Sequence, residues 1–202
     1  MLISIVMTLV IAATPILLAG LGELIVEKSG VLNLGVEGMM LVGAVAGFIA
    51  TTLTGVTPLG YVVAALAGLA ASLLFAALTL TLGANQVATG LALTIFGTGL
   101  SSLAGAGFVG TTITRLEPLF PAALATHPLG RLVFGYDVIV YLTIGLTLAA
   151  AHFLNHTRSG LILRGVGESD ASAHAIGYPV TAIRYGAVAF GGAMAGLAGA
   201  YY

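Results

Sequence analysis

The residues most able to do chemistry lie in one short stretch, from Gly22 to Met40. It holds three of the seven acidic residues of the chain and its only lysine. Glu23 and Glu27 are four positions apart, so in a helix they would share a face and repel by roughly 0.2–0.5 kcal/mol. Glu37 directly precedes an apolar run, and a carboxylate at membrane depth needs a partner or a wet cavity. The stretch is therefore either a solvated loop or a structured break at a working site.

Other patterns that can carry chemistry are weaker. His152 and His156 would share a helix face, but no third metal ligand lies near them, so interfacial histidines are the better interpretation. Residues 105–110 match the dinucleotide pattern Gly-x-Gly-x-x-Gly without a strand before them, which favours a glycine-rich turn. The sequence contains no nucleophile motif and no phosphate-binding loop. We therefore predict no catalytic residue, no cofactor and no metal site, so ATP hydrolysis would need another subunit.

The composition excludes a surface that faces mainly water. Of the 202 residues, 59% are hydrophobic and 6% are charged, and the mean hydropathy is +1.13. Soluble domains carry about 25% charged residues, so the main solvent of this chain must be a lipid bilayer. The net charge is −1 and cysteine is absent. Nothing therefore points to nucleic acid, disulfides or thiolate metal sites.

Apolar runs long enough to cross a bilayer, which takes roughly 20 helical residues, recur along the whole chain. We predict an all-α, polytopic transmembrane protein with about six spans in a single domain, residues 1–202. The spans are expected at Leu2–Leu21, Met39–Leu53, Leu59–Leu82, Val87–Ala104, Tyr136–Leu154 and Arg184–Tyr202. The last run is still apolar where the sequence stops, which predicts a domain that is incomplete at its C-terminus.

Basic residues predict the orientation, because they are enriched in short cytoplasmic loops. If the spans alternate, one side holds four basic residues and the other holds two: Lys28, Arg158, Arg164 and Arg184 against Arg115 and Arg131. We expect the first side to face the cytoplasm.

The same side carries a long polar segment, residues 156–183. Within it, a short helix is expected from Glu168 to Ile176, preceded by Gly167 and ended by Gly177. A short helix held between two spans is a natural docking element for a soluble partner. An ordinary surface loop is the alternative.

Two stretches resemble the permease family of ABC importers for simple sugars, nucleosides and branched-chain amino acids, and the nucleoside branch most closely. The first is Gly22–Met40, which ends in Gly-Val-Leu-Asn-Leu-Gly-Val-Glu-Gly-Met-Met. The second runs from Arg164 to Val180 and continues with Arg184 and the small-residue run Gly191–Ala200. The likeness extends through nearly the whole chain in order. One departure is Ser169, where the family usually has asparagine, and a hydroxyl can cap the short helix as well.

The resemblance implies a non-catalytic, multi-pass permease subunit in the plasma (inner) membrane. With a second permease subunit, identical or related, it would enclose a path for a nucleoside or a simple sugar. Separate ABC ATPase subunits would drive alternating access by pulling a cytoplasmic coupling loop, residues 156–183, and an extracytoplasmic binding protein would deliver the substrate.

The expected site residues fall into two sets. The ATPase-coupling set is Arg164, Gly165, Gly167, Glu168, Asp170, Ala175 and Gly177. The set expected at the translocation path or a structural break is Glu23, Asn33, Gly35, Glu37 and Gly38. The alternative function is an ion-coupled secondary transporter that uses Glu23, Glu27 and Glu37.

Overall fold

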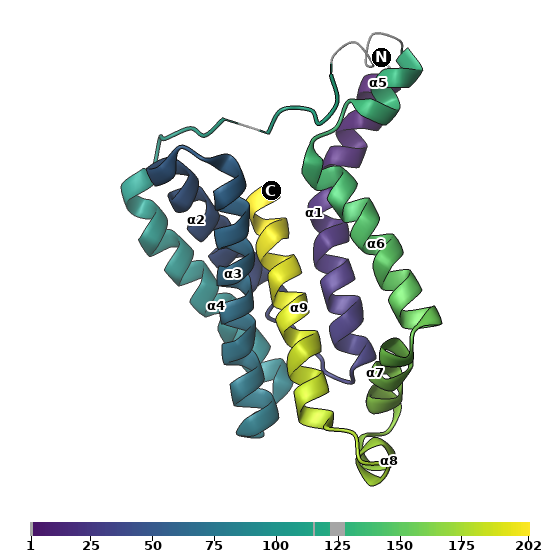
Figure 1. The fold of residues 1–202 in the computed structure, drawn as a ribbon. Coiled ribbons are helices and arrows are strands. Elements are labelled where there is room, and N and C mark those ends of the chain that lie inside the picture. Colours follow the sequence, from purple (N-terminus) through teal and green to yellow (C-terminus); the bar gives the residue numbers. More distant parts are fainter. Residues whose placement is uncertain (1, 115, 122–127) are drawn as a thin grey trace.

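The structure is a computed structural model that describes residues 2–114, 116–121 and 128–202. All regular structure in these residues is helical, and six of the helices are long and apolar enough to cross a membrane. They are α1 (Leu2–Lys28), α2 (Val36–Thr54), α3 (Thr57–Ala76), α4 (Gln86–Gly105), α6 (Val138–His156) and α9 (Val180–Tyr201). The predicted all-α fold with about six spans is confirmed (Figure 1).

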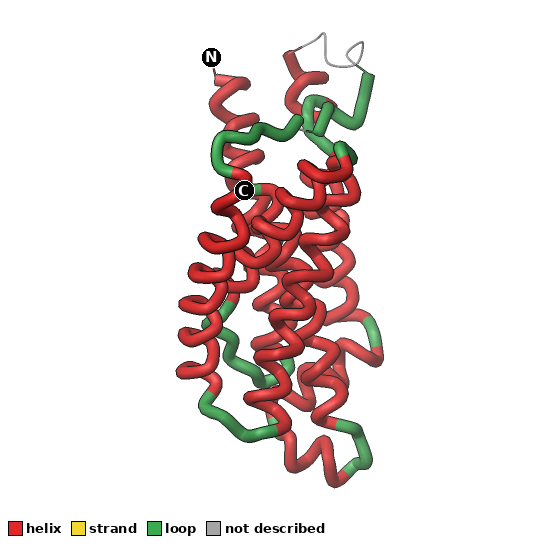
Figure 2. Tube along the Cα trace, turned by 90° about the vertical axis from the view of Figure 1, so that its left-hand side faces the viewer, coloured by secondary structure: helices red, strands yellow, loops and turns green. Residues whose placement is uncertain are grey.

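Shorter elements connect the long helices. A π-helical turn follows α3, and a 3-10 turn follows α4. Their bounds, with those of the three short α-helices, are η1 (Ala77–Thr81), η2 (Ala106–Phe108), α5 (Pro128–Phe134), α7 (Arg158–Glu168) and α8 (Asp170–Ala175). The long helices run roughly alongside one another, and most connecting segments lie near the two ends of the bundle (Figure 2).

Helix α9 lies in the middle of the bundle, with α1 and α6 on one side and α2, α3 and α4 on the other (Figure 1). Glycines let its backbone approach its neighbours closely, as helices in lipid require when no hydrophobic force draws them together. A Cβ built on Gly196 would collide with the carbonyl oxygen of Ala64 in α3. A Cβ built on Gly22 of α1 would lie 2.9 Å from the carbonyl oxygen of Gly191. Glycine is thus required where α9 crosses α1 and α3.

The first span is longer than the sequence prediction. It was expected to end at Leu21, but α1 continues to Lys28 and includes both Glu23 and Glu27. The extra turns bury an apolar face that includes Val26, which is fully buried, and this burial outweighs the polarity of the glutamates. The non-helical segment is therefore only Ser29–Gly35, which we call the helix break.

The basic residues lie as the alternating topology requires. Lys28 ends α1, Arg158 and Arg164 lie on α7, and Arg184 lies in the first turns of α9, all at the end of the bundle that carries α8 (Figure 1). Arg131 lies on α5 at the opposite end. Arg115, also expected there, lies outside the described residues.

One aspartate both begins α6 and ties it to α9. The carboxylate of Asp137 accepts hydrogen bonds from the backbone N–H groups of Ile139 (3.0 Å) and Val140 (3.2 Å). Its second oxygen accepts the hydroxyl proton of Tyr201 at 2.8 Å.

Asp137→Ala should therefore lower the free energy of unfolding by about 1–2 kcal/mol. Thermal unfolding of the purified protein in detergent measures this. Asp137→Asn keeps the oxygen that accepts from Ile139 and Val140, and its amide N–H can donate to the Tyr201 hydroxyl in place of accepting from it, so it serves as the control. An equal loss in the two variants would contradict the assigned hydrogen bonds.

Candidate functional site

The helix break enters the bundle instead of lying at its end. The backbone N–H of Leu32 donates to Oε1 of Gln86, the first residue of α4, at 2.8 Å. Further along, a Cβ built on Gly38 would lie 2.7 Å from Cα of Thr94. With 1.5 Å of rise per helical residue, Gln86 and Thr94 are about 12 Å apart along α4. Between Leu32 and Gly38 the chain therefore advances by about two helical turns along α4.

Polar side chains satisfy the backbone of the break. The N–H of Asn33, a residue that is 3% exposed, donates to Oε1 of Glu23 at 3.3 Å. Its Oδ1 accepts from the N–H of Gly35 at 3.0 Å. The hydroxyl of Thr94 donates to the carbonyl of Leu34 at 3.3 Å. Non-helical backbone at membrane depth is tolerated only where such groups have partners or where it lines a wet cavity.

The five residues expected at the path or break separate into three groups. Glu23, Asn33 and Gly35 are joined by hydrogen bonds, although Glu23 belongs to α1 rather than to the break. Gly38 packs against α4, where a Cβ would lie 2.5 Å from a carbonyl oxygen. Glu37 is separate, because it is exposed in the first turn of α2, where a carboxylate suits the helix dipole.

The other carboxylate oxygen of Glu23, Oε2, is buried and has no hydrogen-bond partner in the described part of the chain. Of the carboxylates of the ion-coupled alternative, Glu23 is half-buried, whereas Glu27, one turn further along α1, and Glu37 are exposed.

The polar segment on the α8 side folds into two helices instead of one. The expected helix was to begin at Glu168, but this residue ends α7. The reason is Ser169, which is extended (φ −153°) and caps α8 by accepting from the N–H of Ser172 at 3.3 Å. The predicted end is correct, because α8 stops at Ala175 and Gly177 follows in the left-handed region at φ +97°.

Most of the coupling residues are open to a partner. Helix α8 projects from the end of the bundle (Figure 1). The exposed members of the set are Arg164, Gly165, Glu168, Asp170, Ala175 and Gly177. Gly167 differs: it is half-buried, and a Cβ there would collide with the carbonyl oxygen of Lys28. Gly167 therefore fits α7 against the end of α1 and does not face outward.

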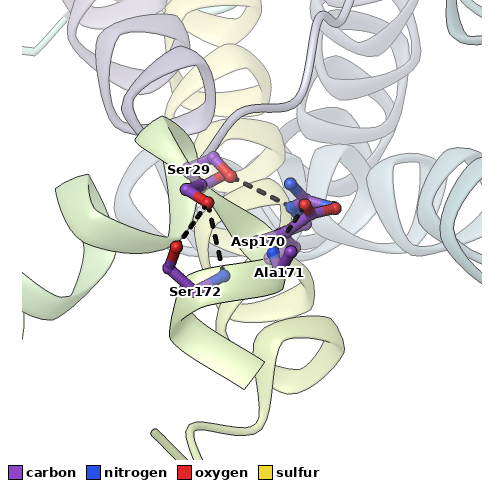
Figure 3. Close-up of polar contacts among 6 residues, drawn as sticks. Ser29, Asp170, Ala171 and Ser172 are labelled. Carbon is purple, nitrogen blue, oxygen red and sulfur yellow. Dashed lines mark hydrogen bonds and ion pairs between the residues drawn. The ribbon is translucent and has the colours of Figure 1, made fainter. Parts of the chain in front are cut away.

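Sequence reasoning missed Arg184 and Gln86 as site residues. The Nε of Arg184 donates to the carbonyl of Ser29 at 3.1 Å, and its Nη1 lies 3.6 Å from Oδ2 of Asp170 (Figure 3). A lone arginine at the start of an apolar run is a usable signal, because such a charge needs a partner. Gln86 gave no comparable signal, since its partner Leu32 is 54 positions away.

The remaining polar candidates offer no further chemistry. His152 and His156 stack with ring centroids 5.2 Å apart and are exposed. In the described parts of the chain, no group of three His, Cys, Asp or Glu side chains can hold a metal ion. An apolar cavity of about 520 Å³ lies between α6, α7 and α9, lined by residues such as Phe153, Ile183 and Phe190. It suits hydrocarbon better than a hydroxyl-rich solute.

Comparisons with known proteins agree along almost the whole chain. A family model described as "Branched-chain amino acid transport system / permease component" matches residues 5–202. A putative glucose ABC transporter permease protein of Haloferax volcanii is 44% identical over 195 residues, covering 94% of this chain and 59% of the relative. A guanosine ABC transporter permease protein of Bacillus subtilis is 32% identical over 208 residues, covering 96% and 65%.

A nucleoside ABC transporter permease protein of Lactococcus lactis is 28% identical over 210 residues, covering 98% of this chain and 66% of the relative. The chain thus spans between 59% and 66% of the length of these relatives. No solved structure matches it. With its six apolar helices, it is a multi-pass protein of the plasma (inner) membrane. The chain belongs to the family of permease components of branched-chain amino acid transport systems.

Proposed function

We propose that the chain forms the membrane-spanning permease part of an ABC importer for a simple sugar or a nucleoside. The family match over residues 5–202 supports transport, and the relatives' names include glucose, guanosine and nucleosides. In this proposal residues 1–202 act as one transmembrane domain. A second permease subunit, identical or related, completes the path, and an extracytoplasmic binding protein delivers the solute.

Separate ATPase subunits power alternating access by moving the coupling loop, residues 156–183. The observation that carries this assignment is the exposed surface of α8 and the turn after it. Ile176 is 75% exposed, and the charged Glu168 and Asp170 lie exposed nearby in the chain. On a short helix that projects from the bundle, Ile176 beside these charged groups offers an apolar anchor with a polar rim, the arrangement of a protein interface, and a cytoplasmic ATPase is the partner that such a subunit needs.

The residues in and around the helix break have two roles in this mechanism. Glu23, Asn33, Gly35 and Gly38 hold the non-helical chain at depth between α1 and α4. Glu37 faces the path, where its carboxylate accepts hydrogen bonds from the hydroxyl groups of the solute. An ion-coupled mechanism has less support, since Glu23 accepts a hydrogen bond from the N–H of Asn33 while Glu27 and Glu37 are exposed.

Replacing Ile176 by serine tests the docking assignment. Burial of an isoleucine side chain at an interface is worth about 2 kcal/mol, which is roughly thirty-fold in affinity. We expect Ile176→Ser to lower co-purification of the ATPase by about this factor while membrane insertion is unchanged.

Val109→Ser is the matched control, because Val109 is an apolar residue that is 86% exposed after α4, at the opposite end of the bundle. It should leave co-purification unchanged. Full ATPase binding by the Ile176 variant would refute docking at α8.

A further inference from the structure

The helix break, the start of α8 and the first turns of α9 meet at Arg184. This residue lies in the first turns of α9 and donates through Nε to the backbone carbonyl of Ser29, at the start of the helix break, at 3.1 Å. Its Nη1 lies 3.6 Å from Oδ2 of Asp170, the first residue of α8. Figure 3 draws Ser29 and Asp170 close to each other at this junction, with dashed lines for the polar contacts among the residues drawn.

The junction is also packed at backbone distance. Gly30 has φ +82°, and a Cβ built on it would lie 3.1 Å from Cα of Gly167 and 3.2 Å from Nη2 of Arg184. A Cβ on Gly167 would collide with the carbonyl of Lys28. At these glycines the backbone at the end of α7 therefore packs directly against the backbone at the start of the break. A displacement of α7 and α8 must move the break or separate these surfaces.

A contribution to folding stability does not by itself explain why an arginine occupies position 184. The Asp170 side chain is 61% exposed and that of Arg184 is 20% exposed, and such surface pairs contribute little to folding. The guanidinium, however, carries several donors in a rigid plane and can hold acceptors from two segments at once. Asp170 is itself oriented, because its Oδ1 accepts from the N–H of Ala171 at 2.8 Å.

We propose that Arg184 is a positioning residue that passes movement of the coupling helix α8 to the helix break. This inference rests on the proposed function, since it assumes that an ATPase moves α8. Movement that reaches Ser29 continues along the break to Leu32, which is bonded to Gln86 of α4, and to Asn33, which is bonded to Glu23 of α1. One arginine thereby links α8 to two spans.

The test uses the assembled transporter with its ATPase subunits. Arg184→Met keeps a long side chain in place of the apolar stem of arginine but removes every hydrogen-bond donor. Amide hydrogen exchange is measured with and without ATP for residues 169–177 and 29–35, beside transport and ATP hydrolysis. In the unaltered protein we expect ATP to change exchange in both segments. In Arg184→Met only residues 169–177 should change, and transport per ATP hydrolysed should fall by at least about five-fold.

Two further variants sharpen the result. Arg184→Lys should show an intermediate defect, because one ammonium group cannot hold both acceptors in a fixed geometry. Arg131→Met removes an exposed arginine of α5, at the opposite end of the bundle, and should leave the ATP response of both segments and the transport ratio as they are in the unaltered protein.

The inference is overturned if, in Arg184→Met, ATP still changes amide hydrogen exchange in both segments and transport is as in the unaltered protein. If this variant does not accumulate, the same outcome in Arg184→Lys overturns it. Absence of any ATP effect at residues 169–177 in the unaltered transporter would contradict ATPase docking itself, so failure of the proposed function is distinguishable from failure of the link.

Discussion

Gly196→Ala should largely prevent the protein from accumulating in folded form. The added Cβ would collide with the carbonyl oxygen of Ala64 and lie 3.2 Å from Cα of Ala65. Both belong to the backbone of α3, which cannot rotate aside as a side chain can. The helices must separate, at a cost of 1–3 kcal/mol or more, roughly the range for an overpacked core. The yield of monodisperse protein extracted from membranes, and its thermal unfolding in detergent, measure the effect.

The matched control lies ten positions earlier in the same helix. Gly186 is exposed, and a Cβ built there meets no heavy atom within 4 Å. Gly186→Ala should therefore fold normally and gain up to about 1 kcal/mol from better helix propensity. Similar yields and melting temperatures for the two variants would mean that α3 and α9 do not touch at backbone distance in the membrane.

The second large effect is expected for Asn33→Asp. The exchange is nearly isosteric, but it introduces a charge at a residue that is 3% exposed. The N–H of Asn33 already lies 3.3 Å from Oε1 of Glu23, so the new carboxylate would stand near an existing one. Its Nδ2, which contacts Sδ of Met39 at 3.6 Å, would be replaced by an oxygen that has no proton to donate.

We expect Asn33→Asp to lower the free energy of unfolding by about 2 kcal/mol or more, the scale for an uncompensated buried polar or charged group. Thermal unfolding in detergent reports it. Asn155→Asp is the control, because Asn155 is exposed on α6 and its side chain donates to the nearby carbonyl of Ala151. Equal melting temperatures for the two variants would show that the break does not depend on the amide.

The sequence predicted the spans well because the bilayer imposes them directly. A helix must satisfy its own backbone in hydrocarbon, so apolar runs of sufficient length mark its position. The predicted boundaries were less accurate where polar residues lie on a helix. Glu23 and Glu27 were placed outside α1, although burial of Val26 and its neighbours extends the helix past them.

The candidate site was predictable only in its local parts. The turn in which Asn33 Oδ1 accepts from Gly35 N–H spans two residues, and the sequence stretch that contains it was identified as a break. The bonds that give this break its path join residues 54 and 155 positions apart, Leu32 to Gln86 and Ser29 to Arg184. Helix α7 was missed because its glycines and arginines were interpreted as loop. Nothing in a single sequence specifies which distant pairs meet.

The contact between the helix break and Arg184 also constrains the order of assembly during synthesis. The carbonyl of Ser29 accepts a hydrogen bond from Arg184, which lies 155 residues further along the chain and is therefore synthesised later. At translation rates of roughly 5–20 residues per second, that donor emerges about 8 to 30 s later. Until then the first spans can insert, but the break between them lacks one of its anchors. The break gains this anchor late, when α9 arrives and Arg184 can donate to it.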